Sequence, residues 1–248
     1  MTRTILFWDI DGTLLTTARA GVLALEDACR EVTGHTLDLQ AIKSDGLTDH
    51  QLTVKILEQA GRKPTTELVE RFLRHHESRL PHRLPQRRGR VLDGIREALA
   101  YLRERRPDIH SMLLTGNTAA GARAKLAHYG LQKLFDGGAF SEDTGPRAGI
   151  AVRALASVRE KFPEAAIEPG HIFVIGDTPH DIDAARAIGA RCIAVATGAY
   201  PQAALEAHGA WMVLERVPDP PAFEALIDSG TAVKHRLRRH GSRRLSPD

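Results

Sequence analysis

Residues 5–13 read Ile-Leu-Phe-Trp-Asp-Ile-Asp-Gly-Thr, an apolar run that ends at Asp9 and is followed by Asp11 and Gly12. This pattern is typical of a buried strand that ends in a pair of carboxylates. An ionised Asp in such a place is costly unless a cation or several hydrogen-bond donors accompany it. Mg²⁺ is commonly held by one or two carboxylates, waters and a phosphate. The stretch therefore predicts a Mg²⁺ site to which Asp9 gives its side chain and Asp11 its backbone.

Two further polar segments also follow short apolar runs. Residues 111–114 lead into Thr115-Gly116-Asn117, and residues 172–175 lead into Gly176-Asp177-Thr178-Pro179-His180-Asp181. In open α/β sheets, ligands bind beyond the carboxyl ends of the strands. We therefore expect Asp9, Thr115 and Asp177 to lie at one edge of a sheet.

Strand and helix patterns alternate along most of the chain. Apolar runs without alternation, typical of buried parallel strands, occupy residues 4–9, 110–114, 171–175, 191–196 and 211–214. Helical spacing of apolar residues occupies 92–105, 119–128, 148–161 and 179–188, the last with Thr178 as N-cap and Pro179 in its first turn. The alternation predicts an α/β fold, with a doubly wound, Rossmann-like parallel sheet as its core.

A helical insertion interrupts this alternation directly after the first strand. It carries helical patterns at residues 20–32, 49–59 and 66–80 and no convincing strand. We predict a discontinuous core of residues 1–14 and 90–230, a helical cap of residues 15–89 that returns through a hinge at 81–90, and a basic flexible tail of residues 231–248.

The motifs as a set resemble the haloacid dehalogenase (HAD) superfamily. Residues 9–14 fit its pattern Asp-x-Asp-Gly-Thr-Leu, and residues 176–181 fit Gly-Asp-x-x-x-Asp. The resemblance spans Thr4 to Val195 and implies a helical cap, inserted after the first motif, that closes over the metal site and selects the substrate. The segment Asp45–Gln51 and the overall layout resemble phosphoglycolate phosphatase-like members.

The carboxylates suit the hydrolysis of a small phosphate monoester. A catalyst must neutralise the charge of the phosphate and supply the attacking atom. We predict that Asp9 attacks phosphorus to form an aspartyl-phosphate, and that Asp11 gives a proton to the leaving oxygen and then activates water. The predicted metal ligands are Asp9, Asp11, Asp177 and Asp181. For Asp181, compensation of the helix dipole is the alternative.

The phosphoryl oxygens and the remaining charge also need partners. Thr115 and the amides of Gly116 and Asn117 are predicted to donate hydrogen bonds to the phosphate, although Thr115 could instead cap the helix at Ala119. The superfamily usually has a Lys before its last motif. The corresponding segment here has Arg147, which we assign as the catalytic cation, with Arg153 as the second candidate.

Several other polar residues are given structural or substrate-facing roles. Gly12 and Thr13 are expected to shape the chain as it leaves the first strand. Arg19 and the segment 45–49 are candidates to face the substrate, with Thr48 as a plain N-cap the alternative. We expect solvated helix faces at His75, His76, Arg105 and Arg106.

Composition limits the other classes of function. The 248 residues are 42% apolar, and no apolar run approaches the length of a membrane span, so we expect a cytoplasmic protein without a membrane partner. Cys29 and Cys192 are expected to be buried and unpaired. Net charge is +3, but the six Lys and Arg residues within 234–244 account for the excess.

Three alternatives to a Mg²⁺-dependent phosphatase remain open from sequence. A phosphomutase would share Asp9 and Asp11 and would differ by excluding water. A receiver-like phosphoacceptor module uses similar residues, but it is about half as long and its acceptor follows the third strand. A nucleic-acid-binding protein would depend on the basic tail alone, and this alternative is disfavoured because no aromatic residues interleave the tail.

Overall fold

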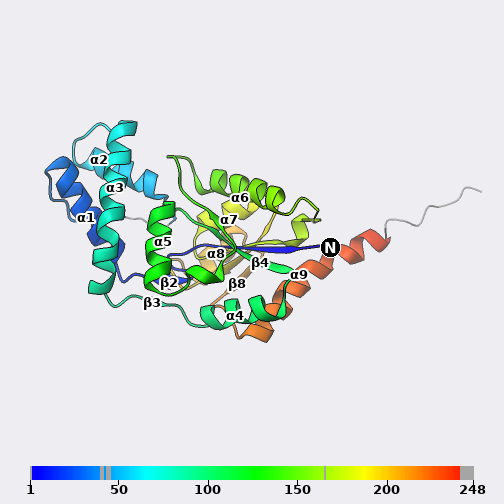
Figure 1. Cartoon of the computed structure of the whole chain (residues 1–248). Coiled ribbons are helices and arrows are strands. Elements are labelled where there is room, and N and C mark those ends of the chain that lie inside the picture. The colour runs from blue at the N-terminus through cyan, green and yellow to red at the C-terminus, as the bar shows by residue number, and fades with distance from the viewer. Residues whose placement is uncertain (1, 40–41, 43–45, 165, 241–248) are drawn as a thin grey trace, which may run out of the picture.

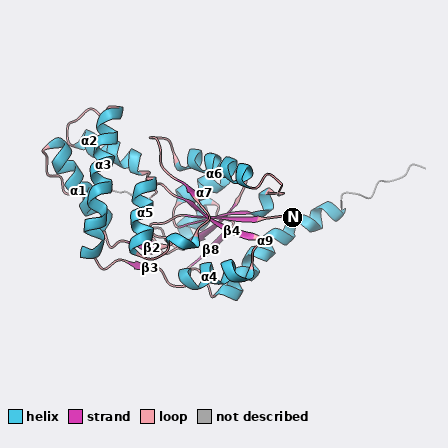
Figure 2. Cartoon of the chain, viewed as in Figure 1, coloured by secondary structure: helices cyan, strands magenta, loops and turns pink. Residues whose placement is uncertain are grey.

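A computed structural model describes residues 2–39, 42, 46–164 and 166–240, with residues 232–240 described as helical backbone only. In this part of the chain the core is a six-stranded sheet of order β5-β4-β1-β6-β7-β8 in which all neighbours are parallel. Figures 1 and 2 show the strands in the middle of the molecule, among the helices. The strands are β1 (Thr4–Trp8), β4 (Ile109–Leu114), β5 (Gly138–Ala139), β6 (Ile172–Gly176), β7 (Arg191–Val195) and β8 (Met212–Leu214).

Helices cover both faces of this sheet. Alternate residues of β1 point to opposite faces, so Leu6 and Trp8 pack against α4 (Ile95–Arg105) and α9 (Pro220–His240). Ile5 and Phe7 belong to the other hydrophobic cluster, with α6 (Arg147–Lys161), α7 (Pro179–Ala187) and α8 (Gln202–His208). The predicted α/β class with a doubly wound parallel sheet is confirmed.

The five predicted strands lie within one or two residues of β1, β4, β6, β7 and β8. β5, at the sheet edge beside β4, was missed because its two residues carry no pattern. Similarly, α8 and α9 were not predicted. Helix α5 (Ala119–His128) matches its predicted bounds.

The insertion after β1 folds as three helices, α1 (Ala20–Thr33), α2 (Asp49–Gln59) and α3 (Thr66–Arg83), grouped at one end of the molecule (Figure 1). They have a hydrophobic core of their own, which includes Leu25, Ile56 and Phe72. The helical insertion is confirmed, and its exact limits at residues 15 and 89 remain a prediction.

The chain enters and leaves the insertion through two short antiparallel strands, β2 (Leu15–Thr16) and β3 (Arg90–Val91). Neither was predicted. The expected hinge at 81–90 is partly helical, because α3 continues to Arg83 and a 3₁₀ turn follows at Leu84–Gln86.

Helix α9 extends past residue 231, where the tail was predicted to begin, and the flexibility of that tail remains a prediction. The helix continues to His240, while residues 241–248 lie outside the described part of the chain. None of the helices in the described residues combines the length and the apolar character needed to cross a bilayer.

Candidate active site

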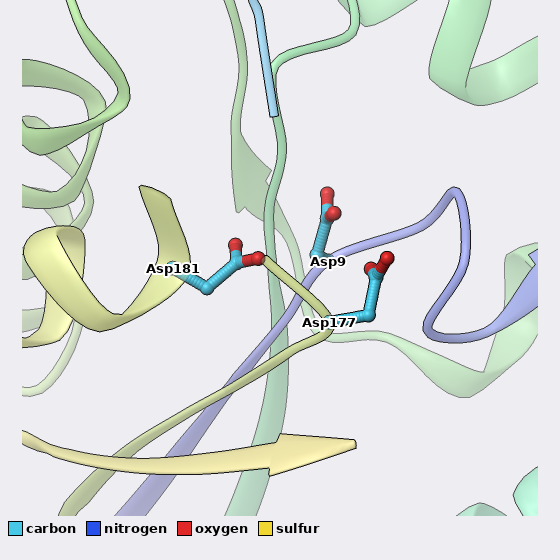
Figure 3. Close-up of side chains that lie close together, drawn as sticks. All are labelled: Asp9, Asp177 and Asp181. Atoms are coloured by element: carbon cyan, nitrogen blue, oxygen red, sulfur yellow. The ribbon is translucent and has the colours of Figure 1, made fainter. Parts of the chain in front are cut away.

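Three acidic residues meet at the carboxyl ends of the two central strands. Asp9 follows β1, Asp177 follows β6 and Asp181 lies in the first turn of α7 (Figure 3). Each offers a carboxylate oxygen that lies within 4.8 Å of the others. Their exposed fractions are 2%, 3% and 0%. Asp9 and Asp177 are 168 positions apart in the sequence, and the parallel pairing of β1 with β6 brings them together.

The chain around Asp177 leaves room for its carboxylate. A Cβ on Gly12, where φ is +83°, would lie 2.3 Å from Oδ2 of Asp177, and one on Gly198 would lie 1.8 Å from the same atom. Thr13 donates its hydroxyl to Oδ1 of Asp177 at 2.8 Å. Thr13 is therefore a direct partner of the site as well as part of the turn after β1, a role that the sequence did not predict.

Asp181 has partners for both of its carboxylate oxygens. Its Oδ2 accepts hydrogen bonds from the backbone N–H of Thr178 at 3.0 Å and from the Thr178 hydroxyl at 2.8 Å, while Oδ1 contacts Arg147. Thr178 is the N-cap of α7, as predicted. By contrast, Oδ1 of Asp9 is buried without a partner among the described residues. Asp9 therefore has the greater need of a ligand.

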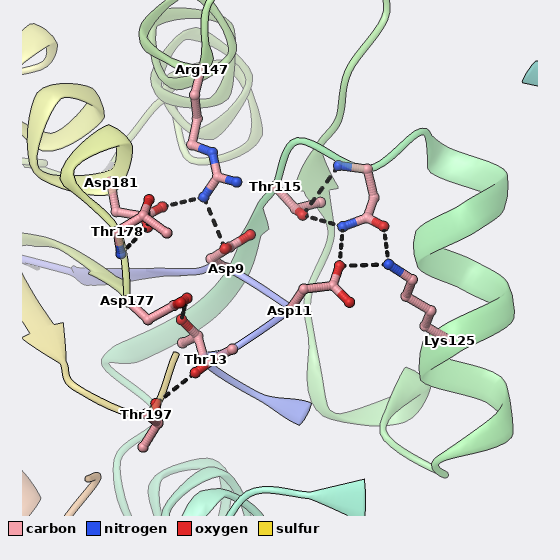
Figure 4. Close-up of polar contacts among 12 residues, drawn as sticks. Asp9, Asp11, Thr13, Thr115, Lys125, Arg147, Asp177, Thr178, Asp181 and Thr197 are labelled. Carbon is pink, nitrogen blue, oxygen red and sulfur yellow. Dashed lines mark hydrogen bonds and ion pairs between the residues drawn. The ribbon is translucent and has the colours of Figure 1, made fainter. Parts of the chain in front are cut away.

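Arg147, the first residue of α6, reaches the acidic cluster. Its Nη1 lies 2.9 Å from Oδ2 of Asp9, and the side chain is 5% exposed (Figure 4). Arg153, the second candidate, has a side chain that is 39% exposed and lies 3.4 Å from Asp143. The geometry thus brings Arg147, and not Arg153, to Asp9.

Burial controls the protonation of the cluster. It raises the pKa of Asp9 to about 6, although the Arg147 guanidinium acts in the opposite direction. Burial and the neighbouring Asp9 raise the pKa of Asp177 well above its ordinary value. Burial alone would lower the pKa of Arg147, but Asp181 and Asp9 outweigh that effect and raise it.

Asp11 turns away from this cluster toward α5. Its Oδ2 lies 2.5 Å from Nζ of Lys125 and accepts a hydrogen bond from Nδ2 of Asn117 at 2.8 Å (Figure 4). Lys125 also donates to Oδ1 of Asn117 at 2.6 Å. Burial would raise the pKa of Asp11, but Lys125 and Asn117 hold it below its ordinary value. The Asp11 carboxylate thus lies outside the group formed by Asp9, Asp177 and Asp181. If Asp11 is a metal ligand, as predicted, it would bind through its backbone carbonyl.

Lys125 was missed because the pattern of residues 119–128 gives no sign of which helix face meets the site. The side chain is 7% exposed. Thr115 is buried and accepts hydrogen bonds from the backbone N–H of Asn117 at 3.3 Å and from its Nδ2 at 2.8 Å. Thr118, rather than Thr115, caps α5. Gly116 is close to Arg147, since an added Cβ would lie 3.3 Å from Nη2.

The insertion contacts the core directly over these residues. The backbone N–H of Asp49 donates to the carbonyl of Gly116 at 2.7 Å, and its Oδ2 accepts from the backbone N–H of Thr118 at 2.7 Å. His50 Nδ1 lies 2.7 Å from the Ser141 hydroxyl. Thr48 forms a capping box with Gln51, which confirms the N-cap alternative.

A cavity of about 310 Å³ lies between core and insertion. Its walls include Asp9, Lys125 and Arg147 from the core, and Arg19, Leu47 and His76 from the insertion. Arg19 therefore faces the site, as does part of the segment 45–49, whereas Asp45 lies outside the described residues.

Two expectations of solvated helix faces are wrong. His76 is only 3% exposed, because α3 packs against α1, α2 and α5. The side chain of Arg106 is 21% exposed and lies 3.0 Å from both Glu224 and Asp228 of α9. Elements distant in sequence cover both residues, α1 and α5 in the case of His76 and α9 in the case of Arg106. His75, with 37% side-chain exposure, pairs with Glu31 at 2.8 Å.

The donor set fits a hard divalent cation. When fully ionised, Asp9, Asp11, Asp177 and Asp181 carry four negative charges against the two positive charges of Arg147 and Lys125, which leaves two negative charges among these six residues. Mg²⁺ prefers carboxylate oxygens and would supply that balance. Such an ion would also give a partner to the buried Oδ1 of Asp9, which has none among the described residues.

Comparison with known proteins places these features in context. The family model described as haloacid dehalogenase-like hydrolase matches residues 6–186. No curated protein matches the chain by sequence. A hydrolase from Pseudomonas syringae is 22% identical with a TM-score of 0.65, and the match covers 92% of this chain and 99% of the other.

Two other solved structures share the fold over nearly their whole length. A predicted phosphoglycolate phosphatase from Haemophilus somnus is 16% identical with a TM-score of 0.66, covering 87% of this chain and 95% of that one. CbbY from Rhodobacter sphaeroides, solved in complex with phosphate, is 17% identical with a TM-score of 0.68, and the match covers 87% of this chain and 95% of that one. At these identities the likeness concerns the fold.

Proposed function

The chain belongs to the haloacid dehalogenase-like hydrolases, and on that premise we propose that it is a Mg²⁺-dependent phosphatase acting on a small phosphate monoester. The observation that carries the proposal is the buried group of Asp9, Asp177 and Asp181, in which one oxygen of Asp9 lacks a partner and the other lies 2.9 Å from Arg147. The phosphate bound by CbbY, a relative in fold, supports the choice of substrate class.

The metal would be held by Asp9 and Asp177, with the backbone of Asp11 as a further ligand and Asp181 in support. When bound, Mg²⁺ would neutralise charge on the phosphate as a Lewis acid. The chain's own contribution is to keep Asp9 and Asp177 fixed: Thr13 donates to Asp177, and Arg147 holds Asp9.

The first displacement would use Asp9 as the nucleophile. A carboxylate oxygen of Asp9 forms a bond to phosphorus, and the bond between phosphorus and the ester oxygen breaks. Arg147 offsets the negative charge gathered around Asp9, while the amides of Gly116 and Asn117 and the Thr115 hydroxyl would donate to phosphoryl oxygens. The leaving ester oxygen takes a proton from the Asp11 carboxyl group and departs as the alcohol, which leaves Asp11 ionised.

The second displacement returns Asp9 to its carboxylate form. Asp11, now ionised, would take a proton from a water molecule, the water oxygen would bond to phosphorus, and the bond to Asp9 would break to release inorganic phosphate. Lys125 and Asn117 favour the ionised form of Asp11, which suits this step and opposes the proton donation of the first one. Their contacts also keep the Asp11 carboxylate apart from the other three.

Phosphate release tests the proposal. We expect the protein to release phosphate from p-nitrophenyl phosphate with Mg²⁺, to lose this activity in EDTA, and to lose it on Asp9→Asn. Asp183→Asn, an exposed Asp on α7, is the matched control and should retain the activity. Normal turnover by Asp9→Asn would exclude Asp9 as nucleophile. A phosphomutase would instead move phosphate to a second hydroxyl without releasing it to water.

A further inference from the structure

His76 is a buried polar residue to which the proposed mechanism gives no task. It lies on α3, borders the cavity over the acidic cluster, and is 3% exposed. Neither ring nitrogen has a hydrogen-bond partner among the described residues. A buried polar group without a partner is costly, so the ring is expected to find one in the functional state.

We propose that His76 determines specificity by hydrogen bonding to a hydroxyl group on the alcohol portion of the phosphate ester. This inference rests on the proposed phosphatase function and names the substrate class. Asp9 and His76 line the same cavity, the first from the core and the second from the insertion, so a small ester attached at Asp9 would have its alcohol portion beneath the cap.

The chemistry of the ring favours a hydroxyl over an anion. Burial lowers the pKa of His76, so the imidazole is neutral, with one nitrogen a donor and the other an acceptor. A hydroxyl can serve either nitrogen because it both donates and accepts. A carboxylate or a second phosphate only accepts when ionised, so it could pair with the protonated nitrogen alone.

The charges of the cap also favour a substrate whose alcohol portion is neutral. Among the described cavity-lining residues that the insertion contributes, Arg19 and Asp49 are the charged ones, and their signs are opposite. The remaining wall includes the apolar Val22, Leu25 and Leu52. This lining has no excess positive charge for a second anionic group, so we infer a monophosphate with a neutral, hydroxyl-bearing alcohol.

The experiment compares esters of similar size. For the wild-type protein with Mg²⁺, kcat/KM is measured for glycerol 3-phosphate, which carries hydroxyls, for ethyl phosphate, which carries none, and for 2-phosphoglycolate, which carries a carboxylate. We expect glycerol 3-phosphate to be preferred over both. His76→Phe should reduce the ratio of glycerol 3-phosphate to ethyl phosphate about tenfold, the typical effect of one hydrogen bond to a buried partner. His76→Gln should restore part of it.

Stability separates recognition from a structural role. Replacing a ring that lacks partners by an apolar one should leave Tm unchanged or raise it, and His76→Leu provides the same test if phenylalanine does not fit. His75→Phe, on the adjacent partly exposed residue, is the control and should keep the wild-type ratio.

An unchanged ester ratio in both apolar variants, or a large fall in Tm in both, would overturn the assignment of His76. A wild-type preference for 2-phosphoglycolate would overturn the substrate class. If the wild-type protein releases phosphate from none of the esters, nor from p-nitrophenyl phosphate, the phosphatase function itself fails and this inference fails with it.

Discussion

Nη1 of Arg147 lies 2.9 Å from Oδ2 of Asp9 and also contacts Oδ1 of Asp181. One guanidinium nitrogen thus joins the carboxylate after β1 to the first turn of α7, inside a site where all three side chains are at most 5% exposed. The contact links activity to stability, because the same cation offsets two buried charges.

Loss of the Arg147 charge should affect both properties. Arg147→Ala is expected to lower kcat/KM. The corresponding activation free energy should rise by on the order of 3 kcal/mol, comparable to the loss of one strong electrostatic contact at a reacting centre. The substitution should also lower the free energy of unfolding by roughly 3 kcal/mol, because two buried carboxylates lose the cation that they share. Steady-state kinetics and urea denaturation measure the two effects.

Arg147→Lys should recover a substantial part of the activity, since the charge returns without the planar geometry. The matched control is Arg153→Ala on the same helix, whose side chain is 39% exposed. A damaging Arg153→Ala beside a harmless Arg147→Ala would show that the cation is misassigned.

The metal-free protein should lose stability as pH rises through the titration of Asp9. The pKa of Asp9 in the folded protein is about 6, above its ordinary value of 3.8, so the folded state holds the proton more tightly than the unfolded chain. The protonated Asp9 therefore contributes roughly 3 kcal/mol to the free energy of unfolding. This contribution is fully present below pH 3.8 and is lost as pH rises through about 6.

The difference in unfolding free energy between wild type and Asp9→Asn, measured in EDTA from pH 4 to about pH 8, isolates this contribution from other titrating groups. The same comparison with Asp183→Asn should show no comparable slope. A difference that stays constant across the pH range would contradict the raised pKa of Asp9.

Mg²⁺ should stabilise the folded protein near neutral pH. An ion that binds only the folded state at a hundredfold excess over its Kd adds about 2.7 kcal/mol. Asp177→Asn should remove most of the rise in Tm on adding Mg²⁺, and in EDTA it should itself raise Tm at pH 8, because it deletes a buried charge beside Asp9. Differential scanning fluorimetry with and without Mg²⁺ measures both shifts.

An equal Mg²⁺ response in wild type and Asp177→Asn would exclude Asp177 as a ligand. Asp183→Asn should respond as the wild type does.

Removal of the Lys125 charge should alter the pH dependence of catalysis. Lys125 is one of the groups that hold the pKa of Asp11 below its ordinary value, so Lys125→Met should raise that pKa. The acid form of Asp11 would then persist to higher pH, and the alkaline limb of kcat/KM for an alkyl phosphate should move upward.

The pH profile of Lys125→Arg should lie nearer the wild type than that of Lys125→Met. Lys133→Met, on an exposed lysine of the same region, should leave the profile in place. An alkaline limb that moves downward in Lys125→Met would mean that Lys125 does not act on Asp11 through its charge.

Local patterns of apolar residues in the sequence determined much of the fold. Apolar runs such as residues 172–175 form buried parallel strands because every side chain in them finds apolar neighbours on one face of the sheet or the other. Because Asp9 and Asp177 each follow such a run, their meeting at one edge could be predicted from strand order and polarity alone. The helical spacing of residues 49–59 and 119–128 likewise matched α2 and α5.

Only the tertiary structure decided which polar side chains face the cavity. Lys125 and His76 occupy helices whose local sequences also suit a solvated face, and they are buried because α5 and α3 pack against each other over the site. The orientation of Asp11 toward Lys125, away from Asp9, is a choice of side-chain direction that neighbouring sequence does not encode. Helix periodicity sets which residues share a face, but the packing partners of that face come from distant parts of the chain.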